Sequence, residues 1–420
     1  MGSFVGYRCS ICNKDYAPDE VQYSCPHDGG NLDVILDYST IKKTVTSQQI
    51  FQSTEASLWR YLPILPVGEP GFKDTPFHRA GDTPVFATSG LGKEFGIQKL
   101  WVKDESRNPT ASFKDRASAV VVARAREILA EVVVTASTGN AGAALAGMAA
   151  AVGQKAIIFA PRTAPPAKIA QLLVFGAQVI LVDGNYDSAF DLTIEAASEF
   201  GWYCRNTGYN PFTAEGKKTA AFEIWEWWET AGKKFSDNHN LVVFVSVGDG
   251  NIISGIHKGF KDLQALGWLE RMPRIIGVQA AGSAAIANAY FMGNEKIIPV
   301  AANTLADSIS VDFPRDGVRA IRAIRETNGT YITVEDEEIL KAIAALGKVG
   351  IFAEPAGATS YAGFVKAAQN GVIYSNDTIL VLNTGSGLKD VKAAMQAVQE
   401  APIIEPSMEA LKHFLERTNG

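Results

Sequence analysis

NPTASFKDR, residues 108–116, is the stretch of this chain that places a lysine at the beginning of a helical pattern. The Asn-Pro pair marks a turn, and the helical pattern follows Lys114 directly. The positive end of a helix dipole lowers the free-energy cost of a neutral amine, and a lysine that forms an imine must be neutral. Lys114 is therefore a candidate nucleophile. On its own, a Lys-Asp-Arg triplet is more often the solvated start of a helix.

Short apolar runs rich in β-branched residues alternate with helical patterns over most of the chain. Runs of this kind are typical of buried parallel strands. The predicted strands are 132–136, 156–160, 177–183, 241–246, 275–279 and 378–383. The helices predicted between them include 116–130, 188–200, 214–230 and 335–346. This alternation predicts an α/β fold with wound, mostly parallel sheets, whose ligands bind where strands end in loops.

Three more polar or glycine-rich segments follow predicted strands. Ser137-Thr138-Gly139-Asn140 offers backbone N–H groups and hydroxyls that suit a carboxylate. Gly248-Asp249-Gly250-Asn251-Ile252 opens a helix, as a phosphate-binding turn does, although it is neither a Walker motif nor a Rossmann fingerprint. Thr384 ends the last strand, where its hydroxyl could meet a heterocycle nitrogen. Alone, each segment is equally an ordinary turn.

Taken together, the four segments resemble the fold type II pyridoxal-phosphate (PLP) enzymes, the group of the tryptophan synthase β-subunit. The resemblance runs from about residue 81 to 398 and is strongest to the threonine synthases. Their NPTGSFKDR signature occurs here with Ala111 in place of glycine. Their Glu-Gly-x-Lys-Thr, Glu-Pro-Ala and Thr-Gly-x-Gly-Leu-Lys-Asp segments occur at 215–219, 354–356 and 384–390.

The resemblance implies a role for each segment. Lys114 would be the catalytic lysine that holds PLP as a Schiff base. Asn140 would bond the 3-hydroxyl of the cofactor, Gly248 to Ile252 would bind its phosphate, and Thr384 would meet its pyridine nitrogen. Ser137, Thr138 and Gly139 would bind the substrate carboxylate. A hydroxyl at the pyridine nitrogen favours elimination and replacement over transamination.

The implied reaction is that of a carbon–oxygen lyase, which converts O-phosphohomoserine and water to threonine and phosphate. Threonine synthases usually carry an arginine for the substrate phosphate where this chain has Thr213. Lys217 or Lys218 would substitute, without the bidentate fork of a guanidinium. The glycine turn is also one residue shorter than usual and contains Asp249. These departures leave two alternatives: a β-eliminating or β-replacing enzyme, such as a serine/threonine ammonia-lyase or a cysteate-synthase-like enzyme, or a binding protein with a relic PLP fold.

The first forty residues carry a different pattern, Cys9-x-x-Cys12 followed by Cys25-Pro-His27-Asp28. Two such knuckles are typical of a zinc ribbon, in which Cys9, Cys12 and Cys25 would be ligands and Asp28 or His27 the fourth. The alternative is a ribbon that has lost its metal. We therefore expect a zinc-ribbon-like module at 1–40. We also expect a large PLP-binding domain at 41–120 and 206–420, and a small α/β domain at 121–205.

Composition limits the binding partners and the cellular locations that we expect for this chain. The chain has 420 residues, 47% of them hydrophobic, and a formal net charge of −6, which argues against nucleic acid as a partner. No apolar run reaches the roughly 20 residues that span a bilayer, and the N-terminus lacks the pattern of a secretory signal. We expect a cytoplasmic enzyme with an amino-acid substrate, and the family resemblance suggests a homodimer.

Overall fold

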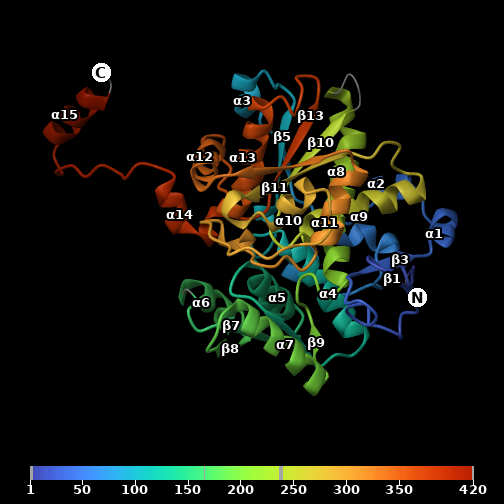
Figure 1. Ribbon diagram of the computed structural model, residues 1–420. Helices are drawn as coiled ribbons and strands as arrows, with labels where there is room; N and C mark the ends of the chain where they lie inside the picture. The colour runs from blue at the N-terminus through green and yellow to red at the C-terminus, as the bar shows by residue number, and fades with distance from the viewer. Residues whose placement is uncertain (1–2, 165, 236–239, 419–420) are drawn as a thin grey trace.

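The computed structural model describes residues 3–164, 166–235 and 240–418. Figure 1 shows two stacked α/β units, a small sheet at the N-terminus beside them, and a C-terminal helix, α15 (Met408–Thr418), that stands away from the body. Among the described residues, no helix combines the length and apolarity required to cross a bilayer.

The larger unit is built on a six-stranded sheet in the order β12-β11-β10-β13-β5-β4. All neighbouring strands are parallel except β4, which runs antiparallel to β5. The strands are β4 (Val85–Ala87), β5 (Leu100–Asp104), β10 (Leu241–Ser246), β11 (Arg274–Ala280), β12 (Thr330–Val334) and β13 (Thr378–Asn383). Because helices cover both faces, the central strands are buried along their whole length.

The smaller unit is a four-stranded parallel sheet in the order β8-β7-β6-β9. Its strands are β6 (Val132–Ala136), β7 (Lys155–Pro161), β8 (Gln178–Val182) and β9 (Tyr203–Cys204). All four lie between residues 121 and 205. The predicted α/β fold with two wound, mostly parallel sheets is thus confirmed, and the six predicted strands match observed strands to within one residue at each end.

Helices flank both sheets, and the predicted ones are all present with shifts of up to three residues at their ends. They are α1 (Tyr38–Thr44), α2 (Ser47–Phe51), α3 (Ser89–Gly92), α4 (Lys114–Glu127), α5 (Asn140–Ala151), α6 (Pro166–Val174), α7 (Tyr186–Phe200), α8 (Phe212–Thr230), α9 (Asn251–Leu266), α10 (Ala285–Phe291), α11 (Gly317–Glu326), α12 (Asp336–Lys348), α13 (Pro355–Gln369) and α14 (Val391–Gln396). A Cβ on Gly216 would lie 2.1 Å from the carbonyl oxygen of Arg116. The glycine of the Glu-Gly-Lys-Lys-Thr segment therefore lets α8 approach α4 closely.

The N-terminal module is a three-stranded antiparallel sheet, β2-β1-β3, made of β1 (Phe4–Cys9), β2 (Asp15–Tyr16) and β3 (Leu32–Leu36). It packs on β9 and on the loop that follows it. The hydroxyl of Tyr23 accepts a hydrogen bond from the Cys204 backbone N–H at 2.8 Å, and the Tyr23 ring stacks on Tyr209 with centroids 4.6 Å apart. Asn31 donates to the carbonyl of Gly208 at 2.6 Å.

The Lys-Asp-Arg triplet is not a solvated helix start, contrary to what such a triplet usually indicates. Asp115 and Arg116 are both fully buried. The loop before them is paired with the end of β13: the Phe113 N–H donates to the Thr384 carbonyl at 2.9 Å, and the Ser386 N–H donates to the Ala111 carbonyl at 3.1 Å. The Asp115 carboxylate accepts the backbone N–H of Thr110 at 2.6 Å, which closes the loop onto the helix.

Ala111 has a backbone φ of 63°, in the left-handed region. That conformation costs an L-residue roughly 1–2 kcal/mol, whereas glycine adopts it freely at an entropic cost of about 0.5–1 kcal/mol. We predict that Ala111→Gly raises the free energy of unfolding in urea by up to about 1 kcal/mol. Ala344→Gly, in the middle of α12, is the control and should lower it by about 1 kcal/mol. Equal losses in both variants would contradict the account.

Candidate active site

A cavity of about 310 Å³ lies where loops of the two sheets meet. This volume is within the range of small-molecule sites. The cavity is lined by every residue that we predicted to contact cofactor or substrate, except Lys218. The four segments that are far apart in the sequence therefore surround a single space.

Lys114 is the first residue of α4 and lines this cavity. Burial lowers the pKa of its ammonium group, and the positive charge of Arg205 lowers it further, while the carboxylate of Glu354 opposes the shift. Desolvation disfavours the charged amine. The site therefore holds Lys114 toward the neutral form that nucleophilic attack on a carbonyl carbon requires.

The Ser-Thr-Gly-Asn loop follows β6 and begins α5. The hydroxyl of Ser137 accepts the N–H of Gly139 at 3.2 Å, which shapes the turn. The amide of Asn140 donates to both carboxylate oxygens of Glu354, at 2.7 and 3.0 Å. Burial raises the pKa of Glu354. The sequence marked Glu354 only as part of a segment shared with threonine synthases, and it gave no sign of this contact.

The glycine turn joins β10 to α9 and presents the backbone N–H groups of a helix N-terminus, which suit an anion. Gly250 has a φ of 90°, a conformation that a side chain would strain. A Cβ on Gly248 would lie 2.8 Å from the Cα of Ile309. Asp249 lines the cavity, but its Oδ1 accepts the N–H of Arg315 at 3.2 Å, and burial raises its pKa.

Thr384 lines the same cavity from the end of β13. The residues present therefore fit PLP on three counts: an amine held toward neutrality, a helix N-terminus open to a phosphate, and a hydroxyl side chain at a strand end. When bound, PLP supplies the electron sink for reactions at the carbons of an amino acid.

Lys217 and Lys218 differ in position. Lys217 lines the cavity and donates to Oδ1 of Asn251. Lys218 is also buried, but its ammonium lies 2.7 Å from Asp262 and pairs with Glu215 as well, outside the cavity. The expectation that Lys218 would serve the substrate is therefore corrected. Consecutive residues of a helix point in different directions, so one of the two lysines faces away.

Arg205, Tyr186 and Thr207 also line the cavity, and the sequence analysis missed all three. Arg205 follows β9 directly, at the carboxyl end of a parallel strand, where ligands usually bind. Its position at the end of a strand was the signal that could have identified Arg205 from the sequence. However, β9 is only two residues long and gives no apolar run from which to recognise it.

The N-terminal cysteines gather as predicted. Cys9, Cys12, Cys25 and Asp28 each offer a ligand atom, and these atoms all lie within 4.8 Å of one another. The Sγ atoms of Cys12 and Cys25 are 3.7 Å apart. Two sulfurs bound tetrahedrally at the usual 2.3 Å from zinc would be about 3.8 Å apart. His27 is exposed and stands outside this group, so Asp28 is the fourth candidate ligand.

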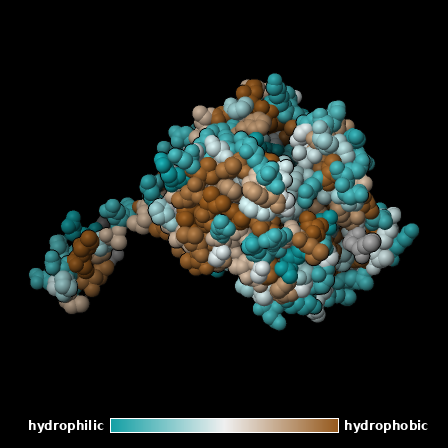
Figure 2. Space-filling model, turned by 90° about the horizontal axis from the view of Figure 1, so that it is seen from below, coloured by the Kyte–Doolittle hydropathy of each residue, from teal (hydrophilic) through white to brown (hydrophobic). Residues whose placement is uncertain are grey.

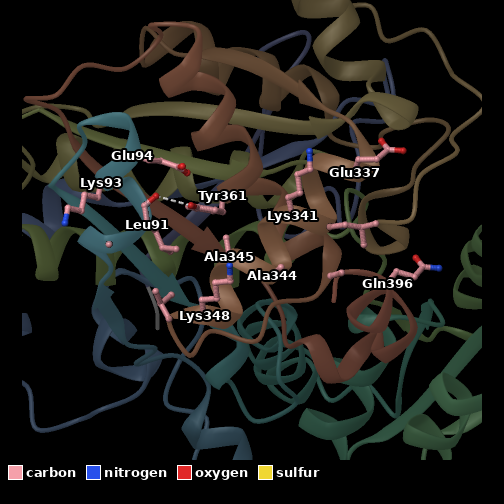
Figure 3. Close-up of a pocket in the computed structure, with 14 residues that line it drawn as sticks. Leu91, Lys93, Glu94, Glu337, Lys341, Ala344, Ala345, Lys348, Tyr361 and Gln396 are labelled. Carbon is pink, nitrogen blue, oxygen red and sulfur yellow. Dashed lines mark hydrogen bonds between the residues drawn. The ribbon is translucent and has the colours of Figure 1, made fainter. Parts of the chain in front are cut away.

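A larger groove of about 1010 Å³ lies between α12, α14 and the segment around α3. Figure 3 shows its lysines, Lys93, Lys341 and Lys348, and the hydroxyl of Tyr361 directed to the carbonyl of Leu91. None of the residues that we predicted for cofactor or substrate lines this groove. The chemistry indicated by the sequence therefore belongs to the smaller cavity.

Comparison with known proteins agrees with this geometry. The model of the pyridoxal-phosphate dependent enzyme family matches residues 77–385. A threonine synthase of Methanocaldococcus jannaschii is 40% identical over 413 residues, covering 97% of this chain and 98% of that protein. A threonine synthase of Methanosarcina acetivorans is 36% identical over 411 residues, with 97% and 98% covered.

Solved structures share the fold at lower identity. The processed form of threonine deaminase isoform 2 from Solanum lycopersicum has a TM-score of 0.63 at 21% identity, covering 89% of this chain and 90% of that chain. Maize serine racemase has a TM-score of 0.64 at 22% identity, covering 80% and 94%. These two likenesses establish the fold, and the full-length relatives establish the family. The chain belongs to the threonine synthase family and is a PLP-dependent lyase of fold type II.

Proposed function

We propose that this enzyme converts O-phosphohomoserine and water to threonine and phosphate. One observation carries the proposal: Lys114, an amine held toward neutrality, shares one cavity with a helix N-terminus suited to a phosphate and with the guanidinium of Arg205. The full-length relatives named threonine synthase support it.

In this proposal each segment that lines the cavity has a role in binding or catalysis. The glycine turn at 248–252 would hold the cofactor phosphate, Asn140 would bond the cofactor's 3-hydroxyl, and Thr384 would meet its ring nitrogen. The turn at 137–139 binds the substrate carboxylate with backbone N–H groups and hydroxyls. Lys114 would hold the cofactor and would move the protons at the substrate Cα and Cβ. The Cγ–O bond then breaks to release phosphate, a proton is added at Cγ, and water supplies the hydroxyl at Cβ.

The alternative is a β-eliminating or β-replacing enzyme that acts on an unphosphorylated substrate such as serine or threonine. Thr213, in place of the usual arginine, motivated that alternative. The cavity nevertheless contains Arg205, which stays charged at neutral pH because burial lowers its pKa only to about 10, and a buried positive charge is stabilised by an anion. The site therefore favours a phosphorylated substrate.

Product analysis tests the reaction. We predict that the PLP-loaded enzyme releases phosphate and threonine from O-phosphohomoserine in equal amounts. Lys114→Ala should reduce this turnover below detection, because the variant lacks the amine that we propose to hold the cofactor and transfer the protons. Lys348→Ala, in the larger groove, should leave it unchanged. A yellow protein that releases no phosphate, but changes colour with serine, would refute the proposal in favour of the alternative.

We further propose that the Cys9, Cys12, Cys25 and Asp28 cluster binds a structural zinc ion. Three thiolates and one carboxylate in tetrahedral reach are a known zinc ligand set. The backbone also supports the cluster, because the Ile11 N–H donates to Sγ of Cys9 at 3.3 Å and the Gly30 N–H donates to Oδ1 of Asp28 at 2.9 Å. Such contacts orient metal ligands.

Metal analysis tests this second proposal. Purified enzyme should contain about one zinc ion per chain, and the double variant Cys9→Ser/Cys12→Ser should lose it. Cys204→Ser is the matched control, since Cys204 is a buried thiol outside the cluster. Emission spectroscopy measures the zinc content without reference to activity. Equal zinc in all three proteins would rule out this site.

We also propose a cytoplasmic homodimer. Figure 2 shows an extended apolar area on the face seen from below. Exposed apolar side chains on α6 and after β13 include Leu173, Val174 and Leu388, at 55%, 84% and 74% exposure. Patches of this kind often mark protein–protein interfaces. A molecular mass of one chain in sedimentation would refute the dimer. Recovery of the enzyme outside the cytoplasmic fraction would refute the cytoplasmic location.

A further inference from the structure

Arg205 is a buried guanidinium whose hydrogen bonds are incomplete. Its exposure is 0%. Its Nε donates to the hydroxyl of Ser118 at 3.2 Å, and its Nη1 donates to the hydroxyl of Thr207 at 2.7 Å. Its Nη2 is buried and has no hydrogen-bond partner. Both existing partners are neutral, so none of these hydrogen bonds compensates the charge.

In two other buried arginines of this chain, carboxylates compensate the charge of the guanidinium. Arg116 pairs with the carboxylates of Glu105 and Glu223 at 2.7 and 2.6 Å. Arg319 pairs with Asp316 and Asp33. Burial lowers the pKa of Arg205 to about 10, so the group remains charged at neutral pH. The charges of Asp115 and Asp249 favour the charged form, but the hydrogen-bond partners of the guanidinium are neutral, and a buried charge gains free energy when an anion pairs with it directly.

The position of Arg205 is fixed from several sides. Its backbone N–H donates to the Val134 carbonyl at 2.7 Å, which extends the pairing of β9 with β6. The N-terminal module holds the flanking residues through the Tyr23 contact with Cys204 and the Asn31 contact with Gly208. The guanidinium therefore lines the cavity from a braced loop, and it is a preorganised anion ligand.

Thr213 is not a substitute for an arginine at the cavity. It is fully buried, and its hydroxyl donates to the Asn210 carbonyl at 2.7 Å and lies 3.1 Å from Oδ1 of Asn251. Lys217, one turn further along α8, reaches the cavity but already donates to the same Asn251 oxygen. Arg205 is the cavity-lining cation with a buried, unpartnered N–H pair.

We propose that Arg205 binds the phosphate group of the substrate through its Nη2 and so sets the preference of this enzyme for a phosphorylated amino acid. The inference rests on the proposed function and names the residue that replaces the arginine missing at position 213. The other phosphate in this cavity would be that of the cofactor, and the experiment separates the two.

The test compares wild type, Arg205→Met and Arg205→Lys, all loaded with PLP. Arg205→Met removes the charge with an apolar side chain that suits a buried site. Loss of a buried charge-assisted contact predicts a KM for O-phosphohomoserine higher by roughly 30-fold or more, with the PLP content unchanged. Arg205→Lys should recover part of this loss. Arg162→Met replaces an exposed arginine that pairs with Asp183 at 3.4 Å; it is the control and should behave as wild type.

Each other outcome has a defined meaning. If Arg205→Met keeps the wild-type KM while wild type makes threonine, the inference is overturned and the proposed function stands. If Arg205→Met loses PLP instead, Arg205 serves the cofactor, and the inference is again overturned. If wild type makes no threonine, the proposed function fails. In that case the binding of inorganic phosphate is measured through its effect on the PLP absorbance. Equal binding by wild type and Arg205→Met overturns the inference about Arg205.

Discussion

The position of the catalytic lysine depends on a buried ion network centred on Arg116. Its guanidinium lies 2.7 Å from Glu105, before the lysine loop, and 2.6 Å from Glu223 on α8. Lys103 on β5 pairs with the same Glu223 at 2.7 Å. Removing one member of such a network typically costs about 3–5 kcal/mol, because the remaining charges stay buried without a partner. Since Lys114 is only two residues away on α4, the network fixes the strand, the loop and the helix that together aim this lysine into the cavity.

The chain uses buried charge in two opposite ways. Around Arg116 the charges are matched, so the network is a rigid support. Around Arg205 the hydrogen-bond partners are neutral and Nη2 has none, so the guanidinium can bind an anion that arrives with substrate or cofactor. The N-terminal module braces the chain on both sides of Arg205, because Tyr23 contacts Cys204 and Asn31 contacts Gly208. A metal in the module would stiffen that loop from outside without touching the reaction, which is a physical reason for a structural ion some distance from the chemistry.

Much of the fold and the cavity could be predicted from the sequence, because buried parallel strands are continuous apolar runs and their ends carry the ligand loops. The rest depends on partners far away in the chain. The strand β5 contains Lys103 and Asp104, whose charges interrupt the apolar pattern, and only the folded chain provides Glu223 and Asn383 as their partners. Lys217 and Lys218 are adjacent in sequence, and only the packing of α8 decides which one faces the cavity.

We propose that Lys114 is the residue that bonds the cofactor, but the cavity contains a second candidate lysine. Lys217 lines the same cavity, and burial lowers its pKa as well. Lys217 is, however, held by Asn251, whereas Lys114 is the first residue of α4 and lines the cavity together with Thr384. Borohydride reduction of the PLP-loaded enzyme, followed by digestion and mass spectrometry, locates the attachment directly. The account predicts that the reduced cofactor is found on the peptide that contains Lys114. Its recovery on the peptide that contains Lys217 would contradict the account.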